Sequence, residues 1–420
     1  MIKPIFSAIV AALVLFSCSA PDQRANDREE MRSDIEFLAS DSLEGRDTGS
    51  EGEAKAAAYL ASRFEALGLK GAGDSASYFQ SFSFKPHPPI TKHGEGDTAT
   101  LGMAVVKERI GRNVLAMVDN GSTETVIIGA HYDHLGYGAE GSLHMGDPQI
   151  HNGADDNASG VAAMLTLAER LKSAKLNSNV LFIGFSGEEK GLYGSNYYVD
   201  NPTVDLENVR YMINMDMVGR MKEDSSLAVY GVGTSPIWKE TVEKVNSDWL
   251  KLIYHESGVG PSDHTSFYLA DMPVLHFFTG QHEDYHKPTD DSDKINYDGL
   301  EMITNFIERI VLELDDKGKL EFTKTKDQTQ EDTPRFKVTL GVVPDYMFDG
   351  EGMRIDGVSE ERPAHTAGII KGDVVIRMGE HMVTDMMSYM EGLGKFEEGD
   401  TTEVEIVREG ANKTFSVIWD

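Results

Sequence analysis

The sequence contains a single cysteine, Cys18, among its 420 residues. With one thiol the chain cannot form an internal disulfide or hold zinc through a set of cysteines. Basic residues are also scarce, since 39 Lys and Arg stand against 70 Asp and Glu, for a formal net charge of −31. Phosphate recognition needs a basic face, so this balance argues against nucleic acid as a partner. Any metal therefore has to be held by histidine and carboxylate side chains.

Long apolar runs are missing except at the N-terminus. Lys3 precedes an apolar stretch over residues 5–16, which is too short to span a bilayer and is typical of a signal peptide. The stretch ends in Leu15-Phe16-Ser17-Cys18, which resembles the lipobox of bacterial lipoproteins. We expect a signal peptide over residues 1–17, a lipid on Cys18, a tether over 18–27 and export to a bacterial membrane, periplasmic or surface-facing. A plain signal peptide with an incidental cysteine is the alternative.

Apolar patterns along residues 28–316 indicate alternating helices and buried strands. The expected helices are residues 29–38, 53–67, 158–171 and 298–314. The expected buried strands are residues 125–129, 179–185, 211–215 and 273–278, with short β-rich runs at 80–89 and 113–117. This alternation predicts an α/β sandwich with a largely buried sheet.

The composition changes after this region. Residues 317–334 are rich in Lys, Asp, Thr and Gln and contain only Leu320 and Phe322 as large apolar residues, which is typical of a linker. Residues 335–420 show short strand patterns again. We expect them to form a second, small β-rich domain.

Histidines and carboxylates gather in five segments, three of which directly follow an expected strand, while a fourth lies shortly after another strand. The segments are residues 129–136, 152–160, 185–191, 214–217 and 284–290. Ligands of open α/β sheets bind outside the carboxyl ends of the strands. A single aspartate after a strand is usually a cap or turn residue, but five such segments in order are hard to explain in that way. They predict a metal site built from imidazole and carboxylate ligands.

The five segments resemble, in the same order, the motifs of the zinc-dependent aminopeptidase family, which includes bacterial leucyl aminopeptidases, the catalytic domain of glutamate carboxypeptidase and the glutaminyl cyclases. The resemblance covers residues 28–316. It implies a three-layer sandwich around a mixed, mostly parallel eight-stranded sheet, with two zinc ions at its carboxyl edge. It also implies a metallo-exopeptidase, most simply an aminopeptidase, that acts on peptides.

The resemblance also implies a ligand set. His131 and Asp216 match the ligands of one zinc ion, and Glu189 and His286 match those of the other. Asp155 matches the aspartate that bridges both ions. Two metals about 3.5–4 Å apart can share a water and lower its pKa toward neutrality.

Three further carboxylates receive roles from the same resemblance. Glu188 matches the general base, which takes a proton from the water and returns it to the leaving amine. Asp133 matches the acid behind His131, and Asp156 matches a structural residue next to the bridge.

The donor to the transition state departs from the family pattern. Bacterial relatives place a tyrosine shortly before a Ser-Asp-His segment, which here is Ser262-Asp263-His264, but position 259 is valine. His264 is a candidate to replace that donor. Tyr285, next to His286, is a further candidate for contact with the metal ligands or the substrate.

Residues 335–420 resemble a PDZ domain. The segment Pro363-Ala364-His365-Thr366-Ala367-Gly368 matches a stretch that bacterial PDZ domains share, and Leu340, Gly341 and Val342 match the peptide-binding loop. The resemblance implies capture of a peptide C-terminus by strand addition. A domain that only packs on the catalytic domain is the alternative.

Two alternatives to an aminopeptidase stay open. One is a glutaminyl cyclase-like transferase, which uses the same scaffold with one zinc ion. The other is a peptide-binding surface lipoprotein that acts through its second domain. The complete set of five expected ligands favours two metals and hydrolysis, and Glu188 argues against a scaffold without catalysis.

Overall fold

The structure is a computed structural model, which describes residues 23–85, 108–138, 141–144, 146–325, 338–345, 348, 350–358 and 362–419. The expected signal peptide, Cys18 and part of the expected tether lie outside these residues, as does the second part of the expected linker. Within the described ranges, no helix has both the length and the apolar character to cross a membrane.

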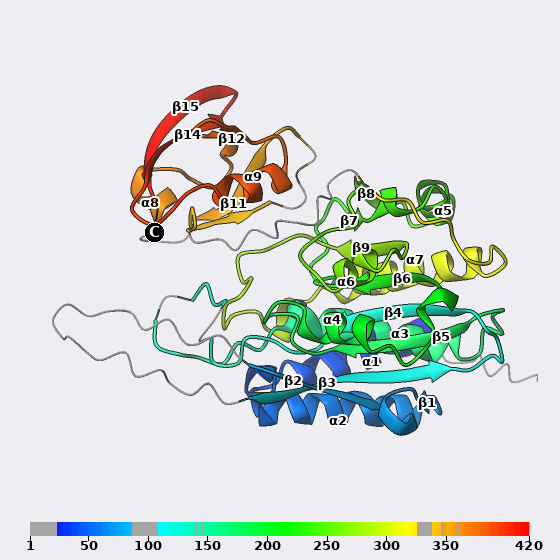
Figure 1. The fold of residues 1–420 in the computed structure, drawn as a ribbon. Coiled ribbons are helices and arrows are strands. Elements are labelled where there is room, and N and C mark those ends of the chain that lie inside the picture. Colours follow the sequence, from blue (N-terminus) through cyan, green and yellow to red (C-terminus); the bar gives the residue numbers. More distant parts are fainter. Residues whose placement is uncertain are drawn as a thin grey trace, which may run out of the picture.

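A nine-stranded mixed sheet forms the centre of the first domain (Figure 1). Its strands are β1 Lys70–Gly71, β2 Phe79–Phe84, β3 Arg109–Val118, β4 Thr125–His131, β5 Asn179–Phe185, β6 Val209–Met215, β7 Ser226–Tyr230, β8 Lys251–His255 and β9 Val274–Phe278. Their order across the sheet is β1-β3-β5-β4-β6-β9-β7-β8, and β2 also pairs with β3. The expected α/β fold class is confirmed, with nine strands in place of eight.

Parallel pairing is concentrated in the middle of the sheet. The neighbours β5, β4, β6 and β9 all run parallel, as do β7 and β8. Antiparallel pairs join β3 to β1, β2 and β5, and join β7 to β9. The described sheet is thus mixed in equal parts rather than mostly parallel. Its four central strands end at one edge, where α/β sheets bind their ligands.

Helices cover both faces of the sheet. They are α1 Gln23–Leu38, α2 Glu51–Ala66, α3 Gly160–Leu171, α4 Tyr193–Asp200, α5 Trp238–Val245, α6 His264–Leu269 and α7 Tyr297–Leu314. One hydrophobic core joins α1, α2, α3, α5 and α7 to the sheet, and another joins α4 and α6 to its opposite face. Every residue of β4, β5 and β6 is buried, which explains why these strands are continuously apolar.

The second domain, orange to red in Figure 1, has its own sheet and core. Its strands are β10 Val342–Pro344, β11 Met353–Val358, β12 Val374–Met378, β13 His381–Met382, β14 Thr401–Arg408 and β15 Ala411–Ile418, and its helices are α8 Pro363–Ala367 and α9 Met386–Leu393. The strand order is β10-β11-β12-β14-β15, with β13 paired to β12.

The residues expected to form a peptide-binding loop lead into β10. Leu340 is buried, and its carbonyl accepts a hydrogen bond from the N–H of Ala364. Gly341 has a φ of 73°, and a Cβ at this position would overlap the side chain of Arg362. Val342 begins β10, which pairs with β11 on one side and, among the described strands, has no partner on the other.

The segment expected to be a linker lies on the first domain as far as residue 325. Leu320 is buried in the first core. The ring of Phe322 packs on Tyr268 with their centroids 5.6 Å apart. Two apolar side chains thus pack on the first domain from a segment whose overall composition is that of a linker.

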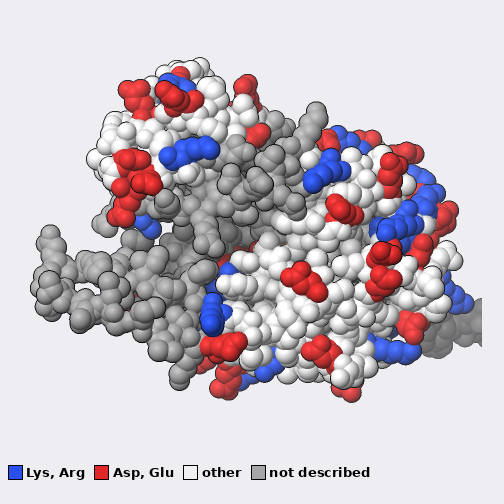
Figure 2. Space-filling view, viewed as in Figure 1, with Lys and Arg blue, Asp and Glu red and all other residues white. Residues whose placement is uncertain are grey.

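Surface charges are interspersed on the face drawn in Figure 2, where acidic and basic side chains alternate over much of the first domain. Ion pairs join Lys244 to Glu313 at 2.6 Å and Lys251 to Asp224 at 3.1 Å. On this face the excess negative charge is distributed, as a charge that serves solubility would be.

Candidate metal centre and active site

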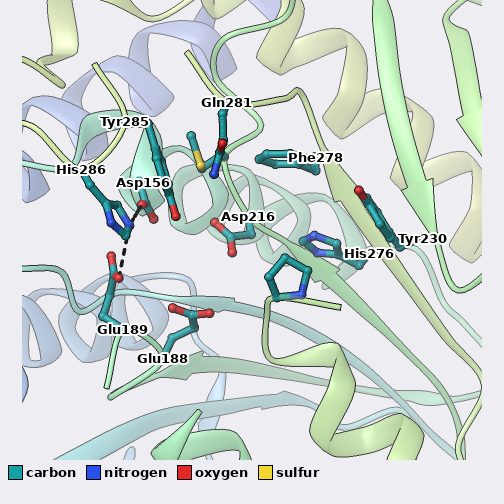
Figure 3. Close-up of a pocket in the computed structure, with 12 residues that line it drawn as sticks. Asp156, Glu188, Glu189, Asp216, Tyr230, His276, Phe278, Gln281, Tyr285 and His286 are labelled. Atoms are coloured by element: carbon teal, nitrogen blue, oxygen red, sulfur yellow. Dashed lines mark ion pairs between the residues drawn. The ribbon is translucent and has the colours of Figure 1, made fainter. Parts of the chain in front are cut away.

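The carboxyl ends of the four central strands bring the candidate residues to one pocket. His131 is the last residue of β4, Asp216 follows β6, and Glu188 and Glu189 follow β5. His286 lies in the loop after β9. The pocket has a volume of about 60 Å³ and opens to solvent, and carboxylates and imidazoles surround it (Figure 3).

One carboxylate, that of Asp156, faces two histidines at once. Its Oδ1 lies 3.3 Å from Nε2 of His131, and its Oδ2 lies 3.2 Å from Nε2 of His286. Each histidine also faces a second carboxylate: Asp216 Oδ1 is 3.3 Å from Nε2 of His131, and Glu189 Oε2 is 3.3 Å from Nε2 of His286. The result is two groups of one imidazole and two carboxylates each, with Asp156 shared.

The separations within both groups fit tetrahedral zinc. With Zn–N and Zn–O bonds of about 2.0–2.2 Å, two ligand atoms on a tetrahedral ion lie about 3.3–3.6 Å apart. A hydrogen-bonded nitrogen and oxygen would be closer, at about 2.9 Å. The four nitrogen-to-oxygen distances of 3.2–3.3 Å therefore suit ligands arranged around cations better than four direct hydrogen bonds.

The other nitrogen of each ring is bound to a backbone carbonyl. His131 Nδ1 lies 3.2 Å from the carbonyl oxygen of Asp133, and His286 Nδ1 lies 2.8 Å from that of Gly141. A carbonyl oxygen only accepts, so Nδ1 carries the proton when either ring is neutral. Nε2 then presents its lone pair toward Asp156, which is the tautomer that a zinc ligand needs.

Asp155, which the sequence predicts as the bridge, faces away from the pocket. Its Oδ1 accepts from the N–H of Gly219 at 2.7 Å and from Ser159 Oγ at 3.0 Å. Its Oδ2 lies 3.1 Å from Nε2 of His282. The structure corrects this prediction, because the carboxylate between the two histidines belongs to Asp156, which was expected to be structural.

Glu188 lines the pocket without belonging to either ligand group, and Figure 3 shows its carboxylate on the side of Asp216. Its N–H donates to Asp133 Oδ1 at 3.2 Å, and Thr48 Oγ1 donates to Asp133 Oδ2 at 2.8 Å. Asp133 thus ties the end of β4 to the loop that carries Glu188. Burial raises the pKa of Glu188 well above its ordinary value, and raises the pKa of Asp133 to about 6.

The surrounding carboxylates govern the charge of the histidines. Burial by itself lowers the pKa of His286, but Glu189 and Asp156 outweigh it and raise that pKa to about 9. Burial likewise lowers the pKa of His131, and Asp216 and Glu188 raise it well above the ordinary value. So many negative carboxylates in one buried place hold compensating positive charge beside them, either as protons on the histidines or as bound cations.

His134 is a site residue to which the sequence analysis gave no role. Its Nδ1 lies 2.7 Å from Glu189 Oε1 and 3.9 Å from Asp156 Oδ2. The shorter distance is that of a hydrogen bond and is too short for two ligands of one tetrahedral ion. His134 therefore donates to Glu189 and leaves Glu189 Oε2 to face His286. Its only sequence signal was its place three residues after His131.

Arg46 is a second missed residue and lies buried beneath the site. Its guanidinium donates to four backbone carbonyls, those of Leu38, Tyr132, Asn152 and Gly153. Tyr132 adjoins His131, and Gly153 comes shortly before Asp156, so one side chain holds both ligand-bearing loops. Burial lowers the pKa of Arg46 to about 10, against the opposing charges of Asp133 and Asp156.

His264, a candidate donor to the transition state, does not reach the pocket. Its ring is buried and stacks on His276, with centroids 4.3 Å apart and planes 2° apart. His276 is the one that lines the pocket. Burial lowers the pKa of His264 to about 3, so this ring is neutral. The structure corrects the prediction for His264, and Val259 packs against the core rather than in the pocket.

Tyr285, unlike His264, reaches the pocket. It lines the pocket, and its ring stacks on His286 with centroids 3.8 Å apart. Figure 3 shows its hydroxyl pointing into the pocket on the side of Asp216. A phenolic O–H in this place can donate to an oxygen atom that develops negative charge beside the two ligand groups.

Two family models match the chain. Peptidase family M28 matches residues 113–311, which hold all the ligands named above. These residues therefore resemble an M28 peptidase, and we call the first domain of the structure the M28 domain after this match. The PDZ domain family matches residues 320–418, and we call the second domain the PDZ domain after this match.

Curated relatives of the M28 domain are aminopeptidases. The chain is 28% identical over 237 residues to aminopeptidase YwaD of Bacillus subtilis, and this alignment covers 53% of this chain and 48% of the relative. It is 27% identical over 216 residues to leucine aminopeptidase 2 of Trichophyton rubrum, and this alignment covers 47% of this chain and 42% of the relative. The chain thus spans less than half the length of these two relatives.

Solved structures share the fold of the M28 domain. The zinc aminopeptidase BSAP of Bacillus subtilis gives a TM-score of 0.54 at 20% identity, covering 68% of this chain and 95% of that structure. A glutaminyl cyclase of Bacteroides thetaiotaomicron bound to N-acetylhistamine gives 0.53 at 18% identity, covering 68% and 97%. At these identities the likeness shows the fold, which a peptidase and a cyclase have in common.

Proposed function

We propose that the chain is a zinc-dependent aminopeptidase, which releases N-terminal residues from peptides with the help of two zinc ions. The observation that carries the proposal is Asp156, whose two oxygens face Nε2 of His131 and Nε2 of His286. The match to peptidase family M28 and the aminopeptidases among the relatives support it.

The ligand sets follow from the two groups. His131, Asp156 and Asp216 would hold one ion, and Asp156, Glu189 and His286 would hold the other. Two bound zinc ions supply a water of lowered pKa and polarise the scissile carbonyl. Both sets consist of nitrogen and oxygen donors, as zinc accepts in sites without cysteine.

Glu188 is the group that moves the proton. It lines the pocket, stays outside both ligand sets, and has a pKa that burial raises well above its ordinary value. A base of this kind accepts the proton of the attacking water and then delivers it to the leaving amine. Asp133 holds the backbone of Glu188 in place through the 3.2 Å hydrogen bond to its N–H.

Tyr285 is the proposed donor to the scissile carbonyl oxygen as that oxygen becomes negative. Its ring is fixed against His286, and its hydroxyl lies in the pocket (Figure 3). It would thus supply from the loop after β9 the interaction that family members obtain from a tyrosine near position 259.

A glutaminyl cyclase-like transferase is the alternative on this scaffold, because one such enzyme shares the fold. A digest of a peptide library by the zinc-loaded protein, followed by mass spectrometry, separates the two. The proposal expects stepwise loss of N-terminal residues and about two zinc ions per chain by elemental analysis. Cyclised N-terminal glutamine with one zinc ion would replace the proposal with the cyclase.

We propose that the PDZ domain binds peptide C-termini along β10. The open edge of β10 among the described strands, and the left-handed Gly341 before it, support strand addition at this place. Fluorescence titration with C-terminal peptides and with their amidated forms tests it. Equal binding of both forms would exclude recognition of a carboxylate, and a packing role would then explain the domain better.

We also propose that the chain is exported and anchored to a bacterial membrane through a lipid on Cys18. The lipobox-like segment ending at Cys18 supports this. Metabolic labelling with a fatty acid should mark the parent protein and leave Cys18→Ser unlabelled. Label retained by Cys18→Ser would contradict the proposed site.

A further inference from the structure

Residues 318–325 follow the surface of the M28 domain before the chain continues toward the PDZ domain, and we call them the strap. Arg210 Nε donates to the carbonyl of Gly318 at 2.8 Å, and Leu320 is buried. The N–H of Thr323 donates to the carbonyl of Thr234 at 2.8 Å. Contacts with the M28 domain thus continue along the strap as far as Thr325, the last residue described before 338.

Thr325 makes three hydrogen-bond contacts with the M28 domain. Its N–H donates to the hydroxyl oxygen of Tyr268 at 2.9 Å, and its own Oγ1 lies 2.9 Å from the same oxygen. Oγ1 also accepts from the N–H of Gly258 at 3.3 Å. Phe322 packs on the ring of Tyr268 from within the strap.

Gly258 belongs to a loop over residues 256–263 that forms one wall of the pocket, and Tyr268 lies in α6, directly after this loop. The loop contributes Pro261 to the pocket lining. The ring of Tyr268 lies directly against Gly258, where an added Cβ would come within 2.2 Å of the ring. The strap, the Tyr268 ring and Gly258 are therefore in continuous contact up to the loop that carries Pro261.

We propose that Thr325 is a positioning residue of the peptidase pocket, which holds the Pro261 wall through Tyr268 and Gly258. This inference rests on the proposed peptidase function of the pocket. The strap, which reads as linker by composition, thereby belongs to the M28 domain.

The physical consequence is a selective effect on substrate binding. Glu188 and the ligand groups lie on loops after β4, β5, β6 and β9 and before α3, none of which contacts Thr325 in the hydrogen bonds above. A loosened Pro261 wall therefore weakens the hold on the peptide and leaves the proton transfer intact. In kinetic terms KM rises while kcat stays.

The test compares two valine substitutions in the full-length, zinc-loaded protein. Thr325→Val removes the hydroxyl bonds to Tyr268 and Gly258. Thr323→Val is the matched control, because the side chain of Thr323 is exposed and only its backbone N–H is bound. We expect Thr325→Val to raise KM for a peptide by about threefold to tenfold, the effect of one or two net hydrogen bonds. Thr323→Val should match the parent, and Thr325→Ser should restore the parent KM.

Amide hydrogen exchange provides a measurement independent of activity. Exchange in residues 256–263 should be about tenfold faster in Thr325→Val than in the parent and in Thr323→Val. Unchanged exchange, or an unchanged KM, overturns the role of Thr325. A parent protein without peptidase activity would instead refute the proposed function, and the exchange rates would still decide whether Thr325 holds the loop.

Discussion

Asp155 and Asp156 are neighbours in the chain, yet their carboxylates face different groups. Asp156 faces His131 and His286, whereas Asp155 faces Gly219 and His282. The first arrangement suits a ligand shared by two cations. The second suits a carboxylate that holds the backbone around the site, because its partners are a backbone N–H and a partly buried imidazole.

Asparagine at each of the two positions should therefore give different results. Asp156→Asn removes the negative charge from both ligand groups, so we expect loss of at least one zinc ion and a fall in kcat/KM of about 10³ or more. Asp155→Asn keeps an acceptor for Gly219 and should retain the zinc. Elemental analysis and peptide kinetics of the two purified variants check this. Equal zinc loss in both variants would contradict the assignment of the bridging role to Asp156 alone.

The central strands could be predicted from the sequence because both of their faces are buried. In β4, β5 and β6 every residue is buried, so apolar side chains follow one another without alternation. The outer strands β7 and β8 gave no such signal. Each has five residues, and β8 is partly exposed. Both are placed in the sheet by long-range pairing, because β7 pairs with β9 and β8 pairs with β7, and a local sequence pattern does not report such pairing.

The site could be predicted as a set of segments but not in every residue. His131, Glu189, Asp216 and His286 follow strands whose ends share an edge, so their meeting was predictable. The choice between Asp155 and Asp156 was not, because the backbone there is irregular and Gly153 is left-handed, with a φ of 57°. Arg46 was missed because it acts on backbone carbonyls of distant segments, which no motif reports.

Glu188→Gln should separate catalysis from metal binding. The amide keeps the shape of the side chain but cannot accept the proton, so we expect kcat to fall by about 10²–10⁴. Zinc content should equal that of the parent, because Glu188 belongs to neither ligand group. A variant that hydrolyses peptides at the parent rate would refute the role of general base, and a variant that loses zinc would make Glu188 a ligand.

Arg46→Lys keeps the positive charge but should lower both the stability of the protein and its affinity for zinc. A lysine cannot reach the four carbonyls that the planar guanidinium binds, so polar groups stay buried without partners. We expect a loss of about 3 kcal/mol or more in stability, seen as a lower thermal midpoint, and weaker zinc binding in competition with a chelator. Arg109→Lys, at a partly exposed ion pair, is the control and should cost less than about 1 kcal/mol. Equal effects of the two substitutions would contradict the role of Arg46.

Zinc binding should release protons at neutral pH. The pKa of His286 is raised to about 9 and that of His131 lies well above its ordinary value, so both rings are protonated at pH 7 without metal. A cation takes the place of each proton on Nε2, and the affinity for zinc therefore falls as pH drops below about 9. Calorimetry at pH 7 in buffers of different ionisation enthalpy should give about two protons released per chain. No release would mean that the rings are already neutral.

Tyr285→Phe should lower the rate and leave the ligands in place. The ring of phenylalanine can still stack on His286, as the ring of Tyr285 does at 3.8 Å, so the geometry of this ligand is retained. Only the hydroxyl in the pocket is lost, and loss of one donor to a developing oxyanion lowers kcat by about 10²–10³. KM and zinc content should change little, because the donor acts in the transition state.

Tyr230→Phe, at the opposite wall of the same pocket, is the control: its ring stacks on His255 and in Figure 3 its hydroxyl does not point toward Asp216. Equal rates for Tyr285→Phe and the parent would show that the oxyanion is stabilised without Tyr285.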